Sequence, residues 1–432
     1  MLVHLVTIFQ ILTAVAWATP LTDAAKTGDF KAVQALLAKG ADPELGDTEG
    51  KNALHWAAGE GHREIVAYLL DHHAALNAQD GKFQETPLVE AAQFGRLEVV
   101  KLLLERGAAL ELKGKFGGTA LSAVVGNVGV ASRKTNEVAV YEIIRLLLAH
   151  GADVNTQNKS GETLLHMPAY SNELKLVTVL IGGKVKADLK TIEGETALDY
   201  ACRGKGDVEM FELLSGAGFH PARGLERCLY GAIAESKLKL VTRLLRLTSS
   251  KSSLLVDASF NQRPDDEKIA LLLLANNSDL APQPGNTLTA LHGAAATNKV
   301  MLAEALLKKG ADLKANAFHF TNGDPLHFAA RFGNPQLVSL LLKAGATVNS
   351  KNQFGQTALH AAVQGPLDYQ PSDGPPPDWT RAPAYLNVIE LLLKAGIDVK
   401  TLDTFKATAL DLLEKAGNQD FKIRAKALLG GP

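Results

Sequence analysis

Apolar and polar positions alternate along this chain in blocks of similar design. One block opens at Thr86 and Pro87, continues through a helix-length apolar stretch, and ends with leucines 102–104 and then Gly107. The Thr can cap a first helix, and the Pro fits its first turn because no N–H is needed there. The leucines supply the buried face of a second helix, which the Gly can end in a left-handed conformation. Each block therefore predicts two short helices and a turn.

The block repeats at a nearly constant interval. Between the most regular copies, the steps between its aligned leucines are 33, 34, 33, 33 and 33 residues. A unit of this size cannot bury both of its faces alone, so neighbouring units stack into one continuous core. We therefore expect an all-α repeat solenoid. The aligned leucines are Leu21, Leu54, Leu88, Leu121, Leu165, Leu198, Leu229, Leu255, Leu291, Leu326, Leu359 and Leu410.

The best copies of the block begin at Asn52, Thr86 and Asp324, and the first half of another begins at Gln356. In this order of residues the chain resembles the ankyrin-repeat family over residues 19–429. The resemblance implies about twelve helix-turn-helix units joined by β-hairpin-like turns. It also implies a concave face, formed by the turn tips and first helices, that binds another protein.

The repeats divide the chain into segments of different regularity. We assign residues 19–218 to repeats 1–6 and residues 283–432 to repeats 9–12, the last of which is a C-terminal cap. Residues 219–282 lack the glycine landmarks but keep second-helix patterns from Leu240 and Lys268, which indicates degenerate repeats 7–8 rather than a linker.

The first eighteen residues differ from the rest. Leu2–Ala18 has no Asp, Glu, Lys or Arg and ends in Ala16-Trp17-Ala18, which is typical of a signal peptide cleaved before Thr19. We expect a periplasmic or secreted protein. The alternative is an apolar capping helix or a misassigned start, which would make the protein a cytosolic scaffold.

Two steps between aligned leucines exceed the period. Leu121 to Leu165 spans 44 residues and Leu359 to Leu410 spans 51, which places inserts near 127–139 and 365–385 between the two helices of their repeats. The second insert carries six prolines and predicts a loop or a semi-rigid arm. It is either a contact surface or tolerated surface variation. Its aromatic residues, the candidate partner contacts, are Tyr369, Trp379 and Tyr385.

A second set of candidate partner contacts lies at the turn tips. Four Phe residues lie three residues before the Thr that caps the first helix of their repeat, where the resemblance places the binding face. An aromatic ring there either contacts a partner or packs against the next turn. The four residues are Phe83, Phe116, Phe354 and Phe405.

Histidine at one repeat position indicates structure rather than catalysis. Five of the twelve histidines follow the aligned Leu, where the resemblance implies hydrogen bonds that connect neighbouring turns: His55, His166, His292, His327 and His360. His72-His73 replaces the usual helix-ending Gly, which should loosen that turn. The pair could bind a metal only if further ligands converged on it.

Two further residue types affect local structure. Pro168 takes the position that Ala57, Ala91 and Ala329 hold in the first helices of other repeats. It should kink or shorten its helix, because it removes a backbone hydrogen bond. Cys202 and Cys228 are the only cysteines. In the regular register they lie too far apart for a bridge, so we expect two free thiols.

Composition and motifs exclude several classes of function. The charges nearly balance, 45 basic against 46 acidic residues, which gives no support to nucleic-acid binding. No nucleophile elbow, phosphate loop or zinc-protease motif is present. We therefore expect a non-catalytic protein-binding scaffold without cofactor, metal or membrane span. The alternative is an enzyme or metal-dependent factor at the 365–385 insert, which offers Asp368, Asp373 and Asp378.

Overall fold

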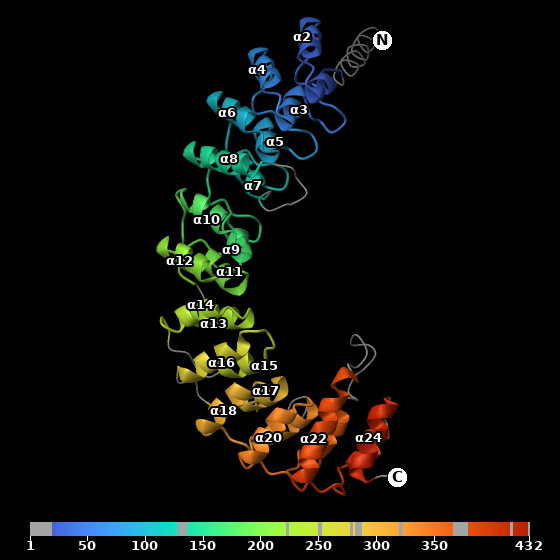
Figure 1. The fold of residues 1–432 in the computed structure, drawn as a ribbon. Helices are drawn as coiled ribbons and strands as arrows, with labels where there is room; N and C mark the ends of the chain where they lie inside the picture. Colours follow the sequence, from blue (N-terminus) through green and yellow to red (C-terminus); the bar gives the residue numbers. More distant parts are fainter. Residues whose placement is uncertain are drawn as a thin grey trace. The chain divides into compact units, whose positions relative to one another are not determined.

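The computed structural model describes residues 20–430 except 127, 129–135, 222–223, 249–252, 277–279, 281–286, 319–322, 366–378 and 415–417. This described part is helical, with one antiparallel bridge between Ala317 and Gly323 and no strand. The predicted all-α repeat solenoid is therefore confirmed (Figure 1). The chain divides into two compact units, Met1–Ala222 and Arg223–Pro432, which are taken in turn below.

Unit 1 is a series of helix pairs in which first helices pack on first helices and second helices on second helices. Residues 20–27 are helical and precede α2 (Phe30–Ala38). The pairs that follow are α3 (Ala53–Glu60) with α4 (Arg63–Asp71), α5 (Pro87–Gln93) with α6 (Leu97–Glu105), α7 (Ala120–Val125) with α8 (Glu137–Ala149), α9 (His166–Ser171) with α10 (Leu174–Ile181), and α11 (Ala197–Arg203) with α12 (Val208–Gly216).

Unit 2 follows the same plan. Its pairs are α13 (Leu225–Ala234) with α14 (Leu238–Leu244), α15 (Ser253–Phe260) with α16 (Asp266–Ala275), α17 (Ala290–Thr297) with α18 (Val300–Lys308), α19 (Pro325–Arg331) with α20 (Pro335–Lys343), α21 (Ala358–Gln364) with α22 (Ala382–Lys394), and α23 (Ala409–Leu413) with α24 (Gln419–Leu429). The short η2 (Trp379–Arg381) leads into α22. Both inserts fall between the first and second helices of their pairs, after α7 and after α21.

The repeated residues perform the local roles that their chemistry suggests. Thr86 caps α5 by accepting a hydrogen bond from the Val89 N–H at 3.3 Å. Gly107 ends α6 at φ 82°, which a residue with a Cβ rarely adopts. Leu147 of α8 and Leu341 of α20 are fully buried, and each of these second helices packs on the second helices before and after it. Helix ends and core therefore follow the period of the sequence.

The histidines after the aligned leucines are structural, as the sequence predicts. Each of the five is buried, and its Nε2 faces a backbone carbonyl of the next turn. His327 Nε2, for example, lies 2.9 Å from the Gln356 carbonyl oxygen, and its Nδ1 lies 2.8 Å from Asp324 Oδ1. The corresponding Nε2 contacts are His55 to Ala78 and Glu85, His166 to Glu195, His292 to Gly323, and His360 to Ala407.

The left-handed turn at the end of the second helix is retained at His72-His73, where the usual Gly is absent. His73 adopts φ 68°, and its N–H donates to the Leu70 carbonyl at 3.2 Å as a glycine would at this position. The sequence predicts a loosened turn here. Instead, the structure retains the helix end with a non-glycine residue in a region that costs about 1–2 kcal/mol.

The expectation of two free thiols is wrong. Neither Cys202 nor Cys228 is free, and both are disulfide-bonded. The expectation assumed the spacing of two regular repeats. That assumption does not hold for α13, which begins after Gly224 at φ 83° and lacks the Thr cap of a regular first helix.

Candidate functional site

Pro168 changes the start of helix α9. The helices α5, α7 and α11 begin directly after their capping Thr, whereas α9 begins at His166, three residues after Thr163. In a helix begun at Leu164, the Pro would offer no N–H to the Leu164 carbonyl, and its ring would clash with that carbonyl. The later start places Pro168 in the first turn, where a missing N–H costs nothing. The predicted shortening is therefore confirmed.

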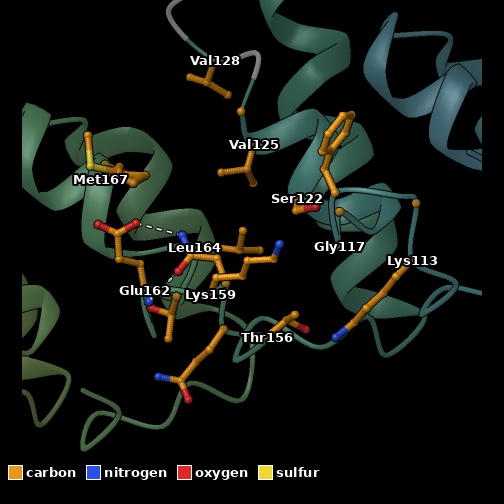
Figure 2. Close-up of a pocket in the computed structure, with 18 of the residues that line it drawn as sticks. Lys113, Gly117, Ser122, Val125, Val128, Thr156, Lys159, Glu162, Leu164 and Met167 are labelled. Carbon is orange, nitrogen blue, oxygen red and sulfur yellow. Dashed lines mark hydrogen bonds between the residues drawn. The ribbon is translucent and has the colours of Figure 1, made fainter. Parts of the chain in front are cut away.

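The row of first helices is interrupted between α7 and α9. In unit 1, α3 packs on α5, α5 on α7, and α9 on α11, but α7 and α9 have no comparable packing among their described residues. A cavity of about 610 Å³ lies at this gap (Figure 2). Such a volume falls within the roughly 300–1,000 Å³ of typical ligand pockets. We call this cavity the α7–α9 pocket.

The interior of the α7–α9 pocket is apolar. Val125 and Val128 face it from the α7 side, and Leu164 and Met167 from the α9 side, as Figure 2 shows. Leu176 of α10 contributes a further apolar side chain. Met167, in the first helix α9, is 52% exposed. Within the described part of unit 1, the pocket therefore offers apolar surface to solvent.

Lysines line one edge of the α7–α9 pocket. Lys113 and Lys115 come from the turn before α7, and Lys159 comes from the turn before α9. All three side chains are exposed, and none makes an ion pair within the described part of the chain. Two turns that are more than forty residues apart in sequence thus present positive charge to the same opening.

Two glutamates also line the pocket, and one of them is bound by neighbours. The Glu162 carboxylate accepts a hydrogen bond from Asn158 Nδ2 at 2.8 Å and another from Tyr200 Oη at 2.8 Å. These hydrogen bonds, that from Asn158 first, lower the pKa of Glu162. Burial, together with Glu162, raises the pKa of Tyr200 to about 12. Glu162 and Glu173 leave the lining with an excess of one positive charge, because three lysines face two carboxylates.

The turn-tip phenylalanines of unit 1 lie beside this pocket. Phe83 and Phe116 occupy neighbouring turns, with ring centroids 6.3 Å apart. Phe116 is 80% exposed and belongs to the lining of the α7–α9 pocket. The sequence analysis identified these two residues as candidates but did not predict the pocket, because the pocket depends on how α7 and α9 pack.

The candidate residues of unit 2 have different surroundings. Phe354 and Phe405 lie at the tips of adjacent turns, and Phe405 is 79% exposed. Tyr369 lies outside the described residues, as do the candidate carboxylates Asp368, Asp373 and Asp378. The backbone of Trp379 opens η2, and its side chain lies outside the described part.

Tyr385 corrects the assigned boundary of the second insert. It lies inside α22, which begins at Ala382, and only 9% of its surface is exposed. Its ring centroid is 6.5 Å from that of Phe421, and burial raises its pKa. The sequence assigned Tyr385 to a proline-rich loop, whereas it is a core residue of unit 2.

A carboxylate cluster that the sequence did not indicate lies in the first repeats of unit 1. Ligand atoms of Asp80, Glu85 and Glu90 lie within 4.8 Å of one another. Lys51 Nζ forms an ion pair with Glu90 Oε1. Burial opposes the charge of this lysine, but the hydrogen bond and charge of Glu90 raise its pKa. The ammonium group of Lys51 thus supplies the cluster with a cation from the chain itself. The sequence could have indicated this cluster through Glu90, a charged residue at the repeat position that Trp56 holds in the preceding repeat.

No helix in the described part of the chain combines the length and the apolar character that a membrane crossing needs.

Comparison with known families identifies the repeat. The family described as "Ankyrin repeats (3 copies)" matches residues 19–114, 131–223, 254–352 and 316–369, which together cover more than half of the chain. The matched ranges contain the turns and helices that form the α7–α9 pocket, apart from residues 115–130.

Individual relatives share the repeats but differ in size. The chain is 27% identical to the E3 ubiquitin-protein ligase KEG of Arabidopsis thaliana over 78% of its own length and 20% of the ligase. It is 30% identical to the nuclear factor NF-kappa-B p105 subunit of Gallus gallus over 46% of its length and 23% of that protein. It is 31% identical to the probable 26S proteasome regulatory subunit p28 of Saccharomyces cerevisiae, over 44% of its length and 81% of that subunit. The chain thus spans about a quarter or less of the first two relatives.

Proposed function

Because the chain belongs to the ankyrin-repeat family, we propose that it is an exported, non-catalytic scaffold that binds another protein through its turn tips, its first helices and the gap between α7 and α9. The family implies protein partners. The yeast relative is by name a regulatory subunit of the proteasome and therefore a component of a protein assembly. These relationships support a binding role, and the residues below support the surface that performs it.

The main support for the proposed binding surface is the exposure of aromatic rings at the turn tips. Phe116 and Phe405 each leave about four-fifths of a large apolar side chain in water. Aromatic residues are enriched where proteins bind one another, because they bury a large area at a small cost in side-chain entropy. In unit 1 the ring of Phe116 adjoins Phe83 and the α7–α9 pocket, which extends the apolar surface beyond one residue. This continuity favours a contact surface over isolated exposed residues.

Capture from cell extract tests the binding role. We expect the full chain to retain a specific partner, and Phe116→Ala or Phe405→Ala to weaken that retention. Val138→Ala and Ile423→Ala are matched controls, because these exposed apolar residues lie on the second helices α8 and α24. Equal retention by the turn-tip variants and the controls would contradict the proposed surface.

Export is a separate part of the proposal. It is supported by the uncharged Leu2–Ala18 and by the Ala-x-Ala ending before Thr19, all of which lie outside the described residues. N-terminal sequencing of the protein from the exported fraction should begin at Thr19. A product that keeps Met1 and stays in the cytoplasm would instead identify a cytosolic scaffold.

A further inference from the structure

The α7–α9 pocket differs from an ordinary junction between two repeats. Among the described residues of unit 1, α3 packs on α5, α5 on α7 and α9 on α11, whereas α7 and α9 lack such packing and the apolar Met167 between them is exposed. The apolar side chains in this cavity of about 610 Å³ face water, and an apolar group that displaced this water would be stabilised there. The pocket therefore has the character of a site for an inserted group.

The edge of the pocket indicates the charge of that group. Lys113, Lys115 and Lys159 line the opening from two turns, and none of them forms an ion pair within the described part of the chain. Glu162, which is held by Asn158 and Tyr200, and Glu173 offset two of the three lysine charges, so the lining keeps an excess of one positive charge. An occupant with carboxylates outside the cavity would pair with the lysines, and its apolar part would fill the interior.

We propose that the α7–α9 pocket binds an extended acidic peptide segment of the partner protein, with one apolar side chain inserted between Val125 and Met167 and acidic neighbours placed against Lys113, Lys115 and Lys159. Phe116, at the lip of the pocket, packs against the segment beside the inserted side chain. The inference rests on the proposed protein-binding function and specifies the chemistry of the ligand.

The shape of the pocket favours a peptide over a small apolar acid. The lysines come from two separate turns, so they fit several carboxylates spread along a chain better than one terminal carboxylate. The exposed ring of Phe116 extends the apolar surface outside the cavity, where a continuing peptide would lie. A fatty acid, with a single carboxylate and one tail, would leave this outer surface unused.

Peptide selection tests the inference directly. Random displayed peptides of about twelve residues would be selected on the full-length protein, and the recovered peptides synthesised with a fluorescent label for anisotropy. We expect Asp and Glu to be enriched around one large apolar residue, and the affinity to fall as sodium chloride rises. A selection that yields no binder, or binders without this pattern, would overturn the inference.

Matched variants locate the binding. Met167→Glu should weaken the selected peptides about tenfold or more, because it places a charge in the apolar interior. Met301→Glu is the control, since Met301 is similarly exposed on α18 of unit 2. Lys159→Ala should weaken binding and reduce its salt dependence, whereas Lys343→Ala, an exposed lysine on α20, should not. Because Met167 and Lys159 are exposed, these changes should leave the circular dichroism melt unchanged.

The two proposals fail in distinguishable ways. Peptides that bind Met167→Glu as tightly as the parent would refute the pocket, even if capture of the natural partner persists. Failure of the parent to capture any partner would refute the scaffold function, while the peptide assay would still report on the pocket. Displacement of the labelled peptide by oleate but by no unlabelled acidic peptide would identify a small apolar acid as the ligand and overturn the inference.

Discussion

Acidification should destabilise unit 2 through a buried histidine of the repeat. The ring of His292 is 0% exposed. Its Nδ1 accepts a hydrogen bond from the Thr289 N–H at 3.1 Å, and its Nε2 faces the Gly323 carbonyl oxygen at 3.1 Å. One nitrogen thus accepts and the other donates, which fits the neutral imidazole. A proton added to Nδ1 would confront the N–H of Thr289 and place a charge in the core.

The size of the effect follows from the shifted pKa. Burial lowers the pKa of His292 from 6.5 to about 4. The unfolded chain therefore binds the proton more readily than the folded chain, so the contribution to stability is fully present above pH 6.5 and is lost as the pH falls from 6.5 toward 4. Between pH 7 and pH 5 this one residue should cost unit 2 about 2 kcal/mol of unfolding free energy.

Urea unfolding at the two pH values, followed by circular dichroism and by hydrogen exchange in α17, measures the loss. His292→Gln keeps a polar side chain but cannot titrate, so it should lose about 2 kcal/mol less than the parent over the same interval. His150→Gln, which replaces an exposed histidine of unit 1, is the control. Equal losses in the parent and His292→Gln, or a folded-state His292 resonance that titrates near pH 6.5, would refute the reasoning.

Three further predictions test the architecture. Leu147→Ala should cost about 2–5 kcal/mol in a denaturant melt, whereas Leu146→Ala in the same helix should cost less because Leu146 is only half-buried, and equal costs would contradict the packing. His73→Gly should raise the free energy of unfolding by about 0.5–1 kcal/mol by relieving the left-handed strain, and no gain would place the strain elsewhere. Deleting residues 366–378 and joining the ends with a short Gly-containing turn should leave the melt unchanged but weaken partner capture. The deletion keeps Arg381, which donates to the Phe332 carbonyl at 2.7 Å. Collapse of the melt would show that the insert supports the fold.

Much of this structure could be read from the sequence, because its determinants are local. The cap formed by Thr86, the left-handed Gly107 and the histidine that connects neighbouring turns each depend on residues within one repeat or at one fixed step to the next. Repetition then multiplies each local signal. The shortening of α9 by Pro168 was predictable for the same reason, since the missing N–H affects a hydrogen bond only four residues away.

The errors arose where one repeat departs from its neighbours. The sequence analysis placed Tyr385 in a loop because many proline and aromatic residues precede it. Instead, α22 begins at Ala382, and the Tyr385 side chain is buried in the core of unit 2. The thiol prediction used the geometry of regular repeats for Cys228, in a helix without the regular cap. Both predictions applied an average repeat to a place where the packing is individual.

The sequence by itself therefore determined the period, the helix pairs, their caps and the structural role of the repeated histidines, because short-range hydrogen bonds and a regular apolar pattern set these features. Only the tertiary structure decided that the apolar residues around Met167 line a cavity, that Lys113 and Lys159 share its opening, and that Lys51 forms an ion pair with Glu90. These features join residues from different repeats, and whether such residues meet depends on how each helix packs against the next.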